Sequence, residues 1–317
     1  MEVVGVILPV VAIAVIGYVV TWIGIFRLDD VGGLTRYVFN VALPVMLFDS
    51  MSTVVLPESI QWSFMLAYYG PTLAVYAVGM WLGLRFFGYN RTEQGVFGMG
   101  CAYSNTVLIG LPVISTAWGD RAILPMMMII SIHSAVLFSL TTAVAESDVR
   151  ARGGSVDRGH FGGSVVLRTV VGMVRNPIFL GLVIGLLFNI WAVPIPRTAG
   201  TVISWLRGSA LPAALFVTGA SLRRYRAGGA LGPSGLMLAM KLVVHPLVVW
   251  VMAAFVFELP PLWSAVAVVT ASLPTGINAS VFAAKYDAAM APVATSVLVS
   301  TALSVVSLSV LLVLLMP

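Results

Sequence analysis

Long apolar runs separated by short polar links cover almost the whole chain. A helix that crosses a bilayer needs about 20 predominantly apolar residues. By that criterion the pattern predicts ten membrane spans: Val3–Ile25, Leu34–Thr53, Phe64–Leu84, Gly95–Ala117, Ala122–Ala143, Asn176–Val193, Thr198–Leu222, Ser234–Phe257, Leu262–Ala284 and Ala291–Met316. The only long link is the Gly- and Arg-rich segment Glu146–Arg168, which leaves five spans on either side. We therefore expect an all-helical membrane protein made of residues 1–145, a connecting loop at 146–170, and residues 171–317.

Two of these spans carry a cluster of polar and helix-breaking residues. Gly100–Val113 reads GCAYSNTVLIGLPV and Ala271–Ser280 reads ASLPTGINAS. Proline lacks a backbone donor and clashes with the preceding helical turn, so each helix is expected to kink or break here. Broken spans in both halves of a membrane protein indicate the binding site of a secondary transporter.

The two halves also share a short sequence. Ala42–Phe48 (ALPVMLF) and Ala210–Phe216 (ALPAALF) differ only at their fourth and fifth positions, and the two broken spans hold similar places in their halves. An odd number of spans per half inserts the halves with opposite orientation. The sequence therefore predicts two inverted five-helix repeats, with a ligand site near the bilayer midplane between them.

Composition supports this assignment and excludes other classes. The chain has 317 residues, of which 60% are hydrophobic and 9% charged, whereas soluble domains carry about 25% charged residues. With Cys101 as its single cysteine and no HExxH or CxxC pattern, it offers no disulfide framework and no expected metal site. No phosphate-binding loop or nucleophile motif is present. We expect neither an enzyme nor an ATP-driven pump, and no cofactor other than a coupling ion, H⁺ or Na⁺.

The basic residues predict the orientation. Cytoplasmic loops accumulate Arg and Lys, and most of the 17 basic residues fall in alternate links, including the long one. This places the 146–170 loop in the cytoplasm and both termini outside, in a cell (inner) membrane. The net charge of +5 is thereby explained without nucleic acid. The first run lacks a basic leader and a cleavage site, so we expect it to be retained as a span.

The broken spans carry the candidate substrate-binding residues. Exposed N–H groups at a half-helix N-terminus and the helix dipole favour an anion such as a carboxylate. Amide, hydroxyl, glycine and proline residues of this kind are Asn105, Thr106, Gly110, Pro112, Pro274, Thr275, Gly276 and Asn278. The alternative interpretation is two ordinary proline-kinked helices packed through small residues.

Ionisable groups inside spans are the candidates for charge or proton coupling. Lys241 and His245 are four residues apart and share a helix face. Lys241 is expected to act as counter-charge or cation surrogate between the broken helices, or else to extend toward the cytoplasmic surface. His245 is a proton relay or a packed, hydrogen-bonded ring.

Three further groups are open to two interpretations. His133, in mid-span, is a proton carrier or an interhelical polar residue. Asp49 is a protonatable carboxylate or a solvated helix end. Arg207 is expected at the outer interface beside Trp205, within an aromatic belt.

Together these motifs resemble the auxin efflux carrier family, which includes plant auxin carriers and bacterial permeases for malonate and malate. The resemblance covers nearly the whole chain. It rests on Ser104-Asn105-Thr106 with Gly110 and Pro112, Arg175-Asn176-Pro177, Ala210–Phe216, Gly219–Leu222, Lys241-Leu242, His245-Pro246, Leu273–Gly276 with Asn278, and Ala284 with Tyr286. The short loop is similar to that of the bacterial permeases.

The resemblance implies crossed broken helices four and nine, and a scaffold domain and a transport domain like those of bile-acid sodium symporters. Helices one, two, six and seven would form the scaffold, and the others would move past it in an elevator-type mechanism. The family's crossover residues correspond to Asn105, Pro112, Pro274 and Asn278.

We therefore expect a secondary transporter of a small organic anion: a mono- or dicarboxylate such as malonate or malate, or an auxin-like acid. The expected partners are membrane lipid, this substrate and a second copy of the chain bound through the scaffold helices. The alternatives are a cation/proton antiporter, which would need membrane-embedded carboxylates that spans four, five, eight and nine lack, and a non-transporting receptor.

Overall fold

The computed structural model describes residues 2–54, 61–151, 176–225 and 230–315, and the regular structure of these residues is helical. The α-helices are α1 (Glu2–Trp22), α2 (Leu28–Tyr37), α3 (Leu43–Thr53), α4 (Trp62–Phe87), α5 (Arg91–Ala102), α6 (Leu111–Trp118), α7 (Ile123–Ala151), α9 (Pro177–Ile190), α10 (Arg197–Leu222), α11 (Leu231–Ala239), α12 (His245–Val251), α13 (Pro261–Ser272), α14 (Asn278–Tyr286) and α15 (Met290–Leu315). Short η segments continue several of them: η1 (Val38–Ala42), η2 (Thr106–Gly110), η3 (Gly119–Ala122), η4 (Met240–Val244) and η5 (Met252–Val256).

Several of these helices have the length and apolarity of membrane spans. Among the described residues five continuous helical stretches qualify: Leu28–Thr53, Thr106–Asp148, Arg197–Leu222, Leu231–Val256 and Met290–Leu315. Three shorter apolar helices accompany them: Ile7–Trp22, Pro177–Ile190 and Pro261–Ser272. Repeated apolar helices of this kind are typical of a multi-pass membrane protein.

Helix α7 includes the first residues of the predicted loop at 146–170, since the structure describes it as helical as far as Ala151. The remainder of the predicted loop, and Arg175 of the motif before α9, lie outside the described residues.

A π-helical turn lies just before each of three prolines inside helices. η1, η2 and η4 each end directly before an α-helix whose second residue is a proline: Pro44, Pro112 and Pro246. The proline ring crowds the carbonyl four residues earlier, and a wider i→i+5 turn relieves that contact. These prolines therefore deform their helices without ending them.

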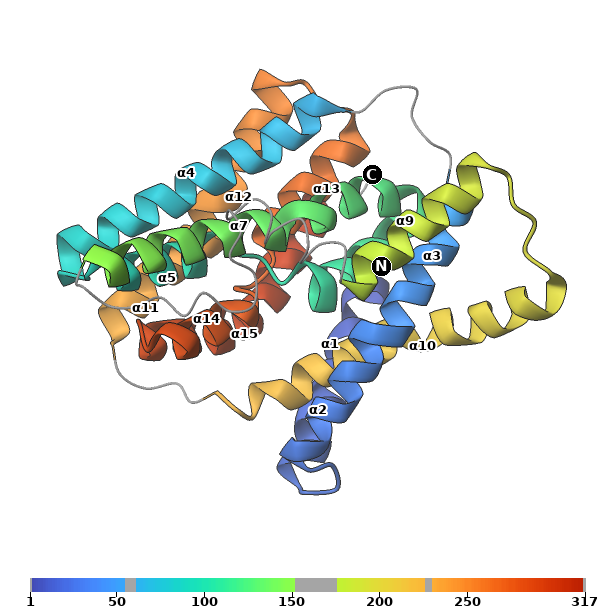
Figure 1. Ribbon diagram of the computed structural model, residues 1–317, viewed down its shortest axis with the longest axis horizontal. Coiled ribbons are helices and arrows are strands. Elements are labelled where there is room, and N and C mark those ends of the chain that lie inside the picture. Colours follow the sequence, from blue (N-terminus) through green and yellow to red (C-terminus); the bar gives the residue numbers. More distant parts are fainter. Residues whose placement is uncertain (1, 55–60, 152–175, 226–229, 316–317) are drawn as a thin grey trace.

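The helices gather into two groups (Figure 1). The first group contains α1, α2, α3, α9 and α10, drawn in blue and yellow. Here α1 packs on α10 and α3 on α9 through glycines: added Cβ atoms at Gly17 and Gly219, or at Gly181 and Gly185, would meet the backbone of the neighbouring helix. The second group contains α4, α5, α7 and α11–α15, and α6 lies where the two groups meet.

Candidate functional site

Two helices are interrupted in the middle of the second group. After α5 ends at Ala102, the segment Tyr103–Asn105 is non-helical, and helical structure resumes at Thr106. After α13 ends at Ser272, residues 273–277 are non-helical, and α14 begins at Asn278. The predicted breaks in these two spans are therefore confirmed.

The two interrupted segments pair with each other. Ser104 and Thr275 form an isolated antiparallel β-bridge. The Asn105 N–H donates to the Pro274 carbonyl, and the Gly276 N–H donates to the Tyr103 carbonyl, each at 3.0 Å. In a bilayer an unpaired backbone group costs several kcal/mol, so each break satisfies the polar groups that the other exposes. We call this paired region, residues 103–105 and 273–277, the crossover.

The two prolines of these spans act differently. Pro274 lies inside the crossover, where its carbonyl accepts the bond from Asn105. Pro112 lies beyond it, in the first turn of α6, so the first break does not occur at a proline. The prediction that proline causes both breaks is wrong for the first, where pairing with the other segment offsets the loss of helical hydrogen bonds.

Glycine permits the close approach at both breaks. A Cβ on Gly276 would collide with the ring of Tyr103 and lie 3.1 Å from the Ser104 carbonyl. A Cβ on Gly110 would collide with Leu273 and Met126. Gly276 therefore allows the close approach of the two crossover segments, whereas a Cβ at Gly110 would require the side-chain ends of Leu273 and Met126 to move.

Lys241 joins the two interrupted helices. Its side chain, in the π-helical turn η4, is fully buried. The Nζ group donates to Ser104 Oγ at 2.7 Å and to the Ala271 carbonyl at 2.6 Å, and lies 3.2 Å from His245 Nδ1. None of the three partners carries a negative charge, so an ammonium group at Lys241 has no counter-ion among them.

Two buried histidines flank this lysine. His245 Nε2 lies 3.0 Å from Thr72 Oγ1 on α4, which fixes its ring beside Lys241. His133 Nε2, on α7, accepts a hydrogen bond from the Ser104 N–H at 3.1 Å, so its proton resides on Nδ1. Within the described residues that buried Nδ1 has no hydrogen-bond partner.

The polar side chains of the crossover differ in availability. Thr275 is fully buried and donates to the Gly100 carbonyl at 3.1 Å, and its N–H is bonded to Ser300. Asn278 donates to the Tyr103 hydroxyl at 2.9 Å. The Asn105 side chain forms no hydrogen bond to any residue that the structure describes, and Thr106 beside it is buried. The Asn105 amide is therefore free to bond a ligand.

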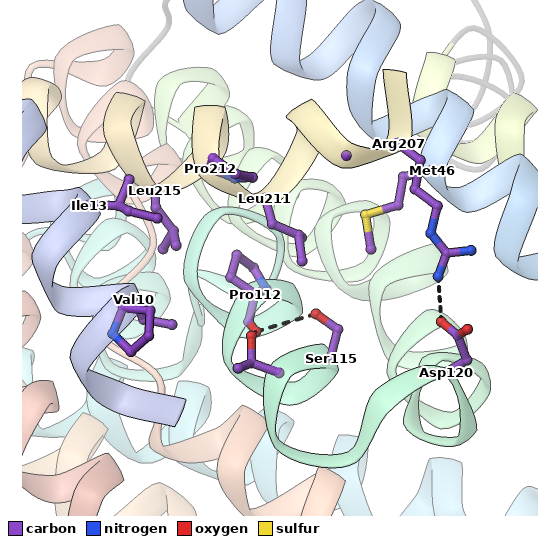
Figure 2. A pocket seen from close by; sticks show the side chains of 13 residues that line it. Val10, Ile13, Met46, Pro112, Ser115, Asp120, Arg207, Leu211, Pro212 and Leu215 are labelled. Carbon is purple, nitrogen blue, oxygen red and sulfur yellow. Dashed lines mark hydrogen bonds and ion pairs between the residues drawn. The ribbon is translucent and has the colours of Figure 1, made fainter. Parts of the chain in front are cut away.

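Asp49 belongs to a different cluster. Its carboxylate binds Arg207 Nη1 at 2.6 Å, while Arg207 Nη2 binds Asp120 at 2.6 Å. Arg207, which was expected at the outer interface beside the exposed Trp205, thus forms two ion pairs. Figure 2 shows this arginine at one side of a pocket that Pro112 also lines. The structure therefore separates Asp49 and Pro112 from the polar contacts of the crossover.

Sequence reasoning missed several partners of the predicted residues. Ser104 contacts both Lys241 and His133, and Tyr103 binds Asn278 and stacks on His133 with ring centroids 4.9 Å apart. Their position directly before Asn105 was an available signal. No sequence signal pointed to Thr72 on α4, because only the three-dimensional arrangement brings it to His245.

Comparison with known proteins covers nearly the full length of the chain. A family profile described as "Membrane transport protein" matches residues 2–156 and 163–312. A protein of Rhizobium meliloti (strain 1021) named "Putative malonate transporter" is 26% identical over 311 residues, which cover 98% of this chain and 95% of that protein. An "Uncharacterized transporter" of Methanothermobacter thermautotrophicus is 24% identical over 314 residues, with 95% of each covered.

Proposed function

The chain belongs to the membrane transport protein family of auxin efflux carriers, which are not enzymes, and on that premise we propose that it is a secondary transporter of a small organic anion. The substrate class is a mono- or dicarboxylate, with malonate as the first candidate because a full-length relative carries that substrate in its name. Transport follows a gradient by alternating access.

The observation that carries this proposal is a buried lysine at the crossover that has no negatively charged partner. Lys241 is fully buried, and its three hydrogen-bond partners are neutral. A buried ion without a counter-ion is costly, and a carboxylate bound nearby would supply the missing negative charge. A cation substrate would add to the imbalance, which disfavours the cation/proton antiporter as the alternative.

The groups around Lys241 suit the same ligand. The Asn105 amide is free to donate, and η2 and α14 begin at the crossover without a side-chain cap. The N-terminus of a helix carries about half a positive charge, which favours a bound anion. We assign carboxylate binding to Asn105, Thr106 and Asn278, while Gly110, Pro274, Thr275 and Gly276 hold the crossover in shape.

The two helix groups suggest how access alternates. The crossover lies within the second group, and the first group packs internally through backbone contacts at its glycines. We propose that the first group is the scaffold, that the second carries the substrate past it, and that the two halves are inverted repeats forming ten spans. His133 and His245 are the candidate proton carriers.

The test is uptake by purified protein in liposomes. Radiolabelled malonate, malate, succinate, acetate and indole-3-acetate are offered with imposed H⁺, Na⁺ or counter-substrate gradients. Saturable accumulation of one carboxylate is expected, and its dependence on the gradient identifies the coupling ion.

The control preparation is Asn105→Ala, which leaves the backbone pairing of the crossover in place. Its uptake is expected to fall while its thermal stability stays unchanged. Failure of folded wild-type protein to move any organic acid, together with Na⁺/H⁺ exchange in the same liposomes, would replace this proposal with the antiporter.

A further inference from the structure

A pocket of about 380 Å³ lies between the two helix groups. Its wall is formed by α1, α3 and α10 on one side and by α6 on the other, and it is mostly apolar (Figure 2). Pro112 and Leu211 face each other across it, and Ser115 and Thr116 add two hydroxyls from α6. Because α6 continues directly from η2, this pocket adjoins the helix that leaves the crossover.

The two terminal nitrogens of Arg207 form ion pairs with aspartates from different helix groups. Nη1 binds Asp49 on α3, within the first group, and Nη2 binds Asp120 in η3, which leads into α7 of the second group. The Asp49 side chain is 25% exposed, whereas that of Asp120 is 72% exposed. Asp49 therefore holds the guanidinium in place, and Asp120 is the carboxylate that solvent can most readily draw away.

We propose that Arg207 is an access site for the substrate carboxylate, and that Asp120 occupies this site until the substrate replaces it. This inference rests on the proposed function and adds a second anion-binding position to it. When Asp120 leaves, Arg207 Nη2 remains as an oriented donor at the edge of the pocket. A ligand carboxylate then forms the same charge-assisted hydrogen bond that Asp120 formed.

The charges of the cluster favour exchange over simple addition. Arg207 with Asp49 is neutral, and Asp120 adds one negative charge. A ligand carboxylate group that displaced Asp120 would restore the same charge at Arg207, while one added beside Asp120 would meet a second carboxylate and be repelled. Displacement also breaks the ion pair that links η3 to α10, so binding here is coupled to separation of the two helix groups.

The direct test measures Arg207 itself. Phenylglyoxal modifies accessible guanidinium groups, and peptide mass spectrometry gives the modification rate at each arginine. Asp120→Asn is expected to increase the rate at Arg207, and malonate is expected to slow that rate in wild type and in Asp120→Asn. Arg197, exposed on the same helix, is the internal reference and should respond to neither.

Transport affinity supplies the second readout. Arg207→Gln should weaken the apparent affinity for malonate about fivefold, and Asp120→Asn should strengthen it by a similar factor, the size of a partly exposed ion pair. Arg197→Gln is the charge-matched control. Malonate transport without any protection of Arg207 would overturn this inference and leave the proposed function standing. If neither transport nor protection occurs with any carboxylate, both fail.

Discussion

Replacement of Lys241 by methionine tests the charge at the crossover most directly. Methionine has a similar length but no charge and no donor, so Ser104 Oγ and the Ala271 carbonyl lose their hydrogen bonds. Hydrogen bonds to a charged group contribute about 1.5–3 kcal/mol each. The desolvation cost of the buried ammonium, several kcal/mol, disappears at the same time. Because these terms oppose each other, the free energy of unfolding is expected to change by no more than about 2 kcal/mol.

Substrate binding has no such compensation. With an effective dielectric constant of about 20, a carboxylate about 4 Å from the ammonium gains about 4 kcal/mol, and one about 8 Å away gains half as much. Loss of the charge should therefore raise the Kd of the anion by a factor between about 30 and about 1,000.

Equilibrium binding of radiolabelled malonate, or of the best substrate in the liposome panel, measures this change in detergent-solubilised protein. The chain's other lysine, Lys285, is exposed and stacks on Tyr286, so Lys285→Met is the matched control and should bind like wild type. Ser104→Ala removes one acceptor but keeps the charge, so its effect should be far smaller. If folded Lys241→Met protein binds with a Kd within about twofold of wild type, the ammonium is not the counter-charge of the substrate.

Three further predictions concern stability, each measured by thermal unfolding of the purified protein in detergent. Gly219→Ala should lower the free energy of unfolding by about 1–3 kcal/mol, because its Cβ would meet the backbone of Ala14. Gly200→Ala on the same helix faces open space and should be neutral or stabilising. Equal melting points of the two variants would contradict the close packing of α1 on α10. Asn189→Leu should lower the free energy of unfolding by about 1–3 kcal/mol, since the Asn189 amide donates to two carbonyls at the end of α3, at 3.0 and 2.8 Å. An unchanged melting point would show that water replaces the amide. Asn90→Ala should cost about 1 kcal/mol by removing the capping box of α5, and the absence of any shift would mean that this helix end is frayed.

Much of the architecture could be predicted from apolar length alone. Helices α10 and α15, for example, are single long apolar stretches, and their sequences leave few alternatives in a membrane. The breaks at residues 103–105 and 273–277 could also be predicted, because each lies in a cluster of polar and helix-breaking residues.

The details of the breaks could not be predicted, because they depend on contacts between distant segments. The sequence pointed to Pro112 as the cause of the first break, yet a π-helical turn accommodates this proline. The break occurs earlier, where Tyr103 and Asn105 form backbone hydrogen bonds to residues 273–277. In the same way, Lys241 was recognisable as an ionisable residue in a span, but its bonds to both broken helices follow from packing alone.

The mutual pairing of the two breaks has a consequence for biosynthesis. The Asn105 N–H and the Tyr103 carbonyl bond to a segment about 170 residues later in the chain. The neighbouring hydrogen bond from Thr275 to Gly100 likewise joins residues 175 positions apart. Until that segment has been synthesised and inserted, the first half carries unsatisfied backbone groups in the bilayer, each costing several kcal/mol. Neither half should therefore persist as a stable fragment, whereas the two halves expressed together as separate chains should find each other and assemble.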